Sequence, residues 1–337
     1  MTTTLSCMGF AAISGSGSAC AGAIGSIMIP PMVKKGYHRG FAVSIVASGS
    51  VIGPIIPPSI NMILWCSITG VSIGALFMSG VVPGVLMGIS LMVCTYVYAK
   101  KNPHIDEGTY GVRIPVSVLL KTIREASFAM LVPFVIIGGI VGGIFTATEA
   151  AAVAIFLSLF AGIFLYKELD TSKMLKYLTD TAMTTASIML VIGFAMTIGW
   201  ALSISRFSET ITAGVTTLTT NPTIFLMLLI ALFTFLGTFM STPELIMIFA
   251  PILHPMCAVY GIHPVHLGLV VIMTCMTGGL TPPVGNLLYI ATGIAQIRLV
   301  ESLKFIWPMV IALTIATLIT AFVPRFALFL PSLLGLI

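Results

Sequence analysis

Long stretches without a basic residue are the feature that most limits what this chain can fold into. No Lys or Arg occurs between residues 40 and 99 or between residues 207 and 297. Hydrophobic residues make up 58% of the 337, charged residues only 7%, and the mean hydropathy is +1.14, whereas a soluble domain is about 25% charged. About 20 apolar residues span a bilayer as a helix. We therefore predict an all-α polytopic membrane protein, because a membrane β-barrel would show short alternating segments.

The basic residues outnumber the acidic ones by 15 to 10, and their placement predicts an orientation. Thirteen of the 15 fall in loops that a simple helix count places on one side, so a nucleic-acid partner is not indicated. By the positive-inside rule this side is cytoplasmic. The thirteen are Lys34, Lys35, Arg39, Lys100, Lys101, Arg113, Lys121, Arg124, Lys167, Lys173, Lys176, Arg298 and Lys304.

Residues for metal or nucleophilic chemistry form no recognisable pattern. The six cysteines have no paired spacing and lie in apolar segments, so we predict neither a disulfide nor a transition-metal site. There is no HExxH motif and no phosphate-binding loop. Ser16 lies between glycines, but it lacks the strand-turn-helix setting of a hydrolase elbow. We therefore expect no enzymatic activity and no organic cofactor.

Adjacent prolines interrupt two of the apolar segments, where they remove amide donors and clash with the preceding helical turn. The pairs are Pro57-Pro58 and Pro282-Pro283. Before each interrupted segment, two apolar arms flank a tip rich in Gly, Ser and Thr, at 14–18 and 237–244. We interpret each pair of arms as a re-entrant hairpin, since irregular backbone at membrane depth is tolerated only where it lines protein or water.

The hairpin and the interrupted segment occur twice, at a fixed separation of 225 residues. The identical pairs include Phe10/Phe235, Ser16/Ser241, Pro30/Pro255, Gly36/Gly261, His38/His263, Gly53/Gly278, Pro57/Pro282, Pro58/Pro283 and Asn61/Asn286. Five predicted crossings separate the copies, and this odd number makes them inverted repeats, as in many secondary transporters. Three predicted crossings before the second copy have no counterpart before the first. We therefore expect an N-terminally truncated chain that lacks about 98 residues before Met1.

The repeat predicts four parts of the chain. They are repeat 1 of a transport domain, with its hairpin and broken helix, at 1–66; scaffold and connecting helices at 67–221; repeat 2, with its hairpin and broken helix, at 222–292; and a C-terminal transmembrane helix at 293–337. Within the second part we expect an amphipathic helix along the membrane surface at 113–126. Unbroken crossings are expected at about 73–99, 127–146, 148–166, 178–204 and 303–323.

Each tip and break offers the groups that a small cation and an anion require. A break frees backbone carbonyls and leaves half-helix N-termini, whose positive dipole ends face the midplane. Carbonyl and hydroxyl oxygens suit a hard cation, and amide donors at helix N-termini suit a carboxylate. Because these segments contain no Lys or Arg, a bound anion would be neutralised by cations and dipoles. This predicts symport of a cation and an anion.

Structural explanations stand beside this prediction. A Pro-Pro pair also serves as a simple kink, and Asn61 and Asn286 would also tie helices together by hydrogen bonds. We expect His38 and His263 to act in loops rather than in a proton relay. Glu149 is expected to cap a helix N-terminus, whereas the role of Glu244, beside the second tip, stays undecided.

Four stretches carry a family resemblance: GSGSACAGAIGSIMIPPMVKKGY at 15–37, GPIIPPSI at 53–60, GGIVGGIFTATEAAAVA at 138–154 and GGLTPPVGNLL at 278–288. In these the sequence resembles the large membrane subunit (DctM-like, M subunit) of tripartite ATP-independent periplasmic (TRAP) transporters. The resemblance implies a sodium-driven, elevator-type ion-transporter fold in the bacterial inner membrane. It also implies two partners, a small four-helix membrane subunit and a periplasmic binding protein that delivers an organic acid of the C4-dicarboxylate or sugar acid class.

By similarity, the sodium ligands and substrate contacts fall on the tips and breaks. Sodium is implied at Ser16, Ser18, Gly53 and Asn61, and in the second copy at Thr238, Ser241, Gly278, Thr281 and Asn286. Substrate contacts are implied at Ser18, Pro57, Ser241, Thr242, Thr281 and Pro282. The chain departs from the family at His38, where an acid is common, at Ala147, where Pro is common, and near Ser241, where Asp is frequent.

Sodium-coupled uptake of an organic acid is the leading functional hypothesis. Within transport, the alternative is a stand-alone sodium/carboxylate symporter, which would need no binding protein. Outside transport, the alternative is an inactive truncated chain with only an assembly role. The particular acid is not indicated, because hydroxyl and amide donors are generic.

Overall fold

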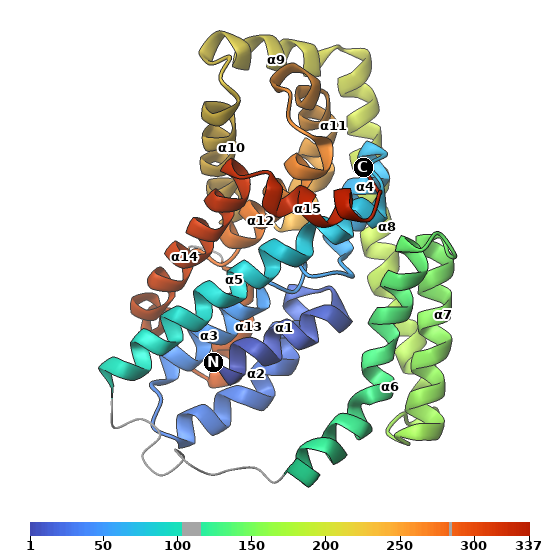
Figure 1. The fold of residues 1–337 in the computed structure, drawn as a ribbon, viewed down its shortest axis with the longest axis vertical. Helices are drawn as coiled ribbons and strands as arrows, with labels where there is room; N and C mark the ends of the chain where they lie inside the picture. Colours follow the sequence, from blue (N-terminus) through green and yellow to red (C-terminus); the bar gives the residue numbers. More distant parts are fainter. Residues whose placement is uncertain (103–115, 283–284) are drawn as a thin grey trace. The chain divides into compact units, whose positions relative to one another are not determined.

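The computed structural model describes residues 1–102, 116–282 and 285–337 (Figure 1). Within these ranges the chain forms helices and turns and no strand. The contacts divide it into two compact units: unit 1 comprises Met1–Gly111 with Ser208–Ile337, and unit 2 comprises the intervening residues. The predicted all-helical class is therefore confirmed for the described part of the chain.

Several helices in the described part are long and apolar enough to cross a membrane. By length and composition the six are Ile73–Lys101, Val116–Val141, Ala147–Leu165, Thr171–Leu202, Thr242–Tyr260 and Leu299–Phe322. A bent pair, Glu209–Leu218 and Pro222–Gly237, meets at 112° and gives a seventh span if the two helices count as one. The polytopic character predicted from composition is thus present in the helices themselves.

The repeat of the sequence recurs in the helix boundaries of unit 1. The first copy consists of α1 (Thr2–Ser14), α2 (Gly17–Lys34), α3 (Arg39–Ser50), α4 (Ile60–Thr69) and α5 (Ile73–Lys101). The second consists of α10 (Pro222–Gly237), α11 (Thr242–Tyr260), α12 (Pro264–Gly278), α13 (Asn286–Ala295) and α14 (Leu299–Phe322). The first residues of α2, α3, α4 and α5 precede those of α11, α12, α13 and α14 by 225 or 226 positions. Both interrupted segments are therefore broken where the prolines predicted a break.

The two copies pack on each other in a reciprocal manner. Helix α2 packs on α13, and its counterpart α11 packs on α4. In the same way α14 packs on α3 and α12 packs on α5, while α5 and α14 contact each other. Contacts that exchange partners in this way are typical of a two-fold relation, as at an isologous interface. The copies thus share one core instead of forming two separate bundles.

The two predicted loop histidines cap equivalent helices. The His38 Nδ1 accepts a hydrogen bond from the Gly40 amide at 3.1 Å, at the start of α3. The His263 Nδ1 accepts from the Val265 amide at 3.3 Å, at the start of α12. Each ring thereby satisfies one of the amide donors that a helix N-terminus leaves free. Both residues therefore lie in the loops where the sequence placed them, as N-caps.

Unit 2 contains α6 (Val116–Val141), α7 (Ala147–Phe160) with a π-helical continuation, and α8 (Met174–Ile204). Helix α6 runs through residue 126 without a break, so no boundary separates the expected surface helix at 113–126 from the crossing after it. No Gly or Pro interrupts the sequence there, and Lys121 and Glu125 form an i,i+4 ion pair at 3.9 Å along the continuous helix. The position of this segment along the membrane surface stays a prediction. The first three residues of the expected surface helix lie outside the described residues.

The start of α7 is a capping box, as expected for Glu149. The Glu149 Oε2 accepts from the Thr146 amide at 2.8 Å, and the Thr146 Oγ1 accepts from the Glu149 amide at 3.3 Å. The two residues satisfy each other's orphan donors. The N-cap residue of this box is Thr146.

Two short helices in unit 1 were not expected. Helix α9 (Phe207–Leu218) precedes α10, and α15 (Arg325–Leu333) follows α14. The C-terminal part was predicted as one transmembrane helix, but α14 ends at Phe322 and the chain turns at Pro324, the residue before α15. Helix α15 packs back on α5 and α12. Proline explains the end of α14, because it cannot continue the hydrogen bonding of a helix.

Candidate functional site

The first tip joins α1 to α2. Gly15 ends α1 in the left-handed region, at φ 61°, and its amide donates to the Ala11 carbonyl at 3.1 Å. Ser16 caps α2, since its Oγ accepts from the Ala19 amide at 3.3 Å. The same Oγ lies 3.1 Å from the Ser18 Oγ. The tip therefore presents two neighbouring hydroxyl groups at the N-terminus of α2.

The first break separates α3 from α4, and residues 51–58 form its turns. Ser59 caps α4 by accepting from the Met62 amide at 3.3 Å. Its hydroxyl also donates to the Pro54 carbonyl at 2.6 Å. One side chain thus satisfies a helix end and a turn carbonyl, so the backbone of the break is held in place.

The first tip rests on the first break. A methyl group added to Gly15 would meet the Pro58 carbonyl, and one added to Gly53 would lie 3.1 Å from the Ser16 carbonyl oxygen. The backbones of the two segments are therefore in direct contact. This contact brings Ser16, Ser18 and Gly53, three of the residues implied for the first sodium, into one neighbourhood.

The second tip joins α10 to α11. The Thr238 Oγ1 donates to the Phe235 carbonyl at 2.8 Å. Ser241 is the N-cap of α11, and its amide donates to the Glu244 Oε2 at 2.9 Å. Reciprocal contacts of this kind between the N-cap and the third helical residue stabilise a helix start. Glu244, whose role the sequence left undecided, therefore acts as a capping residue.

The second break follows α12. The Thr281 amide donates to the Gly278 carbonyl at 2.8 Å, and the Thr281 Oγ1 donates to the Thr277 carbonyl at 3.2 Å. Gly285, at φ 51°, precedes α13. Pro283, the second proline of the predicted break, lies outside the described residues. The break thus keeps a hydroxyl and a freed backbone at the end of α12.

Two glycines bring the second tip against the second break. A methyl group on Gly278 would lie 2.5 Å from the Thr234 carbonyl oxygen and 3.0 Å from the Gly237 Cα. Only hydrogen atoms fit at this crossing of α10 and α12. The close approach places Thr238, the residue after α10, next to the start of the break. Each copy therefore builds the same arrangement, a tip in contact with a break.

The two copies of this tip-and-break arrangement meet at Met276, in the last turn of α12. The Asn61 Nδ2 donates to the Met276 Sδ at 3.5 Å, and the Thr242 Oγ1 donates to the same sulfur at 3.2 Å. A methyl group on Gly17 would lie 3.1 Å from the Met276 Cε. Helices α2, α4 and α11 thus converge on one thioether. The sequence did not single out this residue, because a methionine in an apolar helix carries no local signal.

The implied ligands differ in their exposure. The buried ones are Gly53, Pro57, Asn61, Thr238, Thr242, Gly278 and Thr281; Ser16, Ser241 and Pro282 are partly exposed, and Ser18 and Asn286 are exposed. Asn286 begins α13, whereas the Asn61 amide is already engaged with the Met276 sulfur. The two asparagines, equivalent in sequence, therefore have different surroundings.

The chemistry of the site is that of neutral oxygen donors beside helix ends. Hydroxyl groups and freed carbonyls favour a hard cation, and the N-termini of α2, α4, α11 and α13 favour an anion. The segments that build the site contain no Lys or Arg. These features define the class of the protein: a polytopic α-helical membrane protein whose candidate site is built from paired helix tips and broken helices.

Comparison with known proteins gives the family. The sequence profile of the tripartite ATP-independent periplasmic transporter, DctM component, matches residues 1–326. This chain therefore belongs to the DctM component family of the TRAP transporters, as its motifs suggested. It is accordingly a multi-pass protein of the bacterial inner membrane and a transport protein, not an enzyme.

Curated relatives match over almost the whole chain. It is 37% identical over 329 residues to an isethionate TRAP transporter permease protein, DctMQ, of Oleidesulfovibrio alaskensis, covering 98% of this chain and 51% of that protein. It is 36% identical over 338 residues to a C4-dicarboxylate TRAP transporter large permease protein of Pseudomonas aeruginosa, covering 100% and 78%. A sialic acid TRAP transporter large permease protein of Vibrio cholerae is 35% identical over 324 residues, with 96% and 75% covered. The chain thus spans about half of the first relative and about three quarters of the others.

Proposed function

We propose that this chain is the large permease component of a sodium-coupled carrier that imports an organic acid. A periplasmic binding protein would deliver the acid, and a small membrane subunit would assemble with the permease. The proposal rests on one observation: the two tip-and-break arrangements contact each other at Met276, and the segments that form them contain no Lys or Arg. A carboxylate bound there has helix dipoles and cations as its only counter-charges.

The helix ends and hydroxyl groups support a division of labour within the site. Ser16, Ser18 and the Gly53 carbonyl surround one cation position, with Asn61 at its edge. On the second side the residues are Thr238, Ser241, Gly278, Thr281 and Asn286. The substrate would lie between, against Ser18, Pro57, Ser241, Thr242, Thr281 and Pro282. Sodium is favoured over calcium, because these groups carry no formal charge and calcium sites generally use carboxylates.

The organic acid class is supported by the relatives. Isethionate, C4-dicarboxylates and sialic acid, which the relatives' names give, are all anions at neutral pH. The hydroxyl and amide groups of this site would donate hydrogen bonds to the acidic group of any of these anions. We therefore place the choice among acids mainly in the delivering protein.

The division into two units supports an elevator movement. Unit 1 holds both tips, both breaks and their shared core, so it would move as one body with the substrate. A cysteine introduced at Ser18 should change its labelling by a membrane-impermeant maleimide when sodium and substrate are added. One introduced at exposed Phe156 of unit 2 should not, and equal changes at both positions would contradict the movement.

The test of the function is uptake into proteoliposomes that contain the chain, the small membrane subunit and the binding protein. Replacing external sodium by potassium should abolish the uptake of a labelled acid, and an inward sodium gradient should restore it. Unchanged uptake in potassium would overturn the sodium coupling. Full uptake without the binding protein would instead favour a stand-alone symporter.

A further inference from the structure

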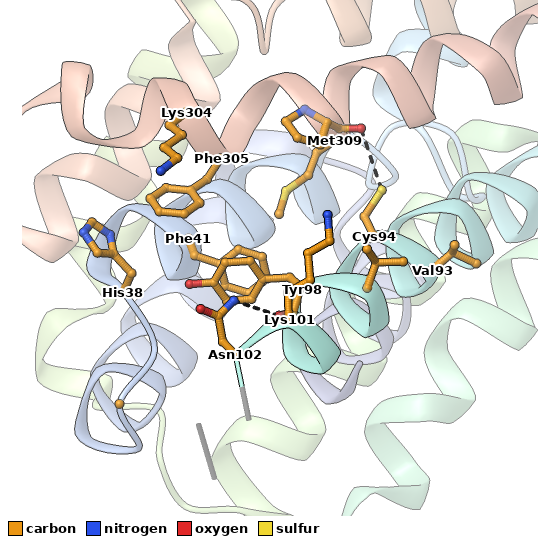
Figure 2. A pocket seen from close by; sticks show the side chains of 13 residues that line it. His38, Phe41, Val93, Cys94, Tyr98, Lys101, Asn102, Lys304, Phe305 and Met309 are labelled. Atoms are coloured by element: carbon orange, nitrogen blue, oxygen red, sulfur yellow. Dashed lines mark hydrogen bonds between the residues drawn. The ribbon is translucent and has the colours of Figure 1, made fainter. Parts of the chain in front are cut away.

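A cavity of about 850 Å³ lies in unit 1, apart from the tips and breaks (Figure 2). It is formed where α5 ends and where α3 and α14 begin. Its lining residues are Gly36, His38, Phe41, Val93, Cys94, Val97, Tyr98, Lys101, Asn102, Lys304, Phe305, Pro308 and Met309. None of them belongs to the transport site described above. The cavity therefore needs its own explanation.

The floor of the cavity is a rigid aromatic cluster. Phe41 and Tyr98 stack with ring centroids 3.6 Å apart and an interplanar angle of 8°. Phe305 stands edge-on to both, at 6.2 and 5.9 Å. The His38 ring lies 4.8 Å from Phe305 and is fixed by its capping bond to the Gly40 amide. Such a floor is preorganised, so a ligand does not have to order it on binding.

Two lysines flank this floor. Lys101 is in the last turn of α5 and Lys304 is near the start of α14, and both side chains are exposed. In the view of Figure 2 their amino groups lie on either side of the aromatic cluster. Among the described residues neither lysine pairs with a carboxylate, and the neighbouring Glu301 accepts from the Arg298 amide at 3.2 Å. The cavity is thus lined by two cations that no carboxylate of the described residues neutralises.

The outer wall of the cavity is apolar and continues along a candidate membrane span. Val93 and Val97 line the cavity and are 56% and 45% exposed. Ile89, one turn earlier on α5, is 48% exposed and extends the stripe. On α14, Trp307 and Ile311, one turn apart, are 50% and 56% exposed. A ligand that combines an anionic head with long apolar chains matches both parts.

The charges are specific to this end of the repeat. Helices α5 and α14 begin 226 positions apart, so Lys101 corresponds to Ala327 and Lys304 corresponds to Met78. The opposite end therefore lacks both cations. The charged end is the one that the positive-inside rule places in the cytoplasm. The cytoplasmic leaflet is also where anionic lipids attract basic residues, and basic pockets between transmembrane helices on that side bind lipid head groups.

We propose that this cavity binds an anionic phospholipid of the cytoplasmic leaflet. The phosphate would lie between Lys101 and Lys304, the glycerol would lie over the Phe41 and Tyr98 rings, and the acyl chains would follow the stripes of α5 and α14. The bound lipid would join the ends of three helices that carry the transport core. It would be a structural ligand of unit 1, and it is independent of the transported acid.

The test is native mass spectrometry of the purified chain titrated with phosphatidylglycerol or with phosphatidylcholine of the same acyl chains. Phosphatidylglycerol should bind more tightly at the first site. The double change Lys101→Gln/Lys304→Gln should raise its Kd about fivefold for each lysine removed, about 25-fold in all. The double change to Arg, which keeps both charges, should leave the Kd within about twofold.

The matched control removes two exposed lysines of unit 2, Lys121→Gln/Lys176→Gln. An equal loss of affinity in this control would mean general surface attraction and would overturn the site.

Inorganic phosphate at 10 mM, about 10⁴ times a micromolar lipid Kd, tests a free anion as the occupant. If phosphate displaces the lipid fully, or if dihexanoyl phosphatidylglycerol binds as tightly as the long-chain lipid, the membrane lipid is the wrong ligand. Both double variants should keep the native unfolding temperature and gel-filtration profile, and a glutamine pair that unfolds is replaced by the single changes.

Discussion

The contact between the first tip and the first break can be tested by adding one methyl group and measuring the free energy of unfolding. In the change Gly15→Ala, the new Cβ carries two separate costs. The residue has φ 61°, and an alanine in the left-handed region costs about 1–2 kcal/mol. The same Cβ meets the Pro58 backbone carbonyl, and overpacking of this kind costs about 1–3 kcal/mol more. We expect the free energy of unfolding to fall by about 2–5 kcal/mol in total.

Two glycines of unit 1 separate these costs. Gly261 ends α11 at φ 63° with nothing within 4 Å of an added Cβ, so Gly261→Ala carries the backbone cost alone. Gly22, inside α2, also has open space, so Gly22→Ala should stabilise the helix by up to about 1 kcal/mol.

Unfolding of the three variants would be followed by SDS titration in mixed micelles of dodecyl maltoside. The loss for Gly15→Ala should exceed that for Gly261→Ala by at least about 1 kcal/mol. Equal losses would refute the contact, because they would leave only the backbone conformation as the cause.

Three further changes test other contacts. Met276→Leu keeps the volume but removes the acceptor of two buried donors; it should cost about 1–2 kcal/mol of unfolding free energy, and a double-mutant cycle with Thr242→Val should show coupling. Thr146→Ala should lower stability by about 1 kcal/mol through loss of the α7 cap, whereas Thr146→Ser should not, as measured by thermal unfolding. Thr281→Ala should raise the sodium concentration for half-maximal uptake without an equal loss of expression; an equal loss of both would favour a folding role.

The breaks and the repeat were predictable because their signals are local. Adjacent prolines interrupt a helix wherever they occur, and a fixed separation of 225 residues is visible without any three-dimensional information. The capping roles of His38, His263 and Glu149 were also open to prediction, since each cap joins residues only two or three positions apart. The helical membrane class was predictable from the amino-acid composition and the length of the apolar segments.

What the sequence did not predict depends on contacts between distant segments. Asn61 and Met276 are 215 positions apart, and nothing near either residue in the sequence indicates the other. The aromatic floor has the same origin, because Phe305 comes from a different copy than Phe41 and Tyr98. The continuity of α6 was not predicted for another reason: a separate surface helix was expected at 113–126, but no Gly or Pro interrupts the chain at its end.

The reciprocal packing of the two copies has a consequence for the order in which the protein is made. Helix α2 finds α13 as its partner, and α4 finds α11, only after most of the chain has been synthesised. The first residues of α2 and α13 are 269 positions apart and those of α4 and α11 are 182 apart. At about 5–20 residues per second, these separations correspond to roughly 9–54 s of synthesis. During this interval α2 and α4 lack the helices that cover them in the complete fold. The inserted first half therefore has to wait for the second half before either can complete its core.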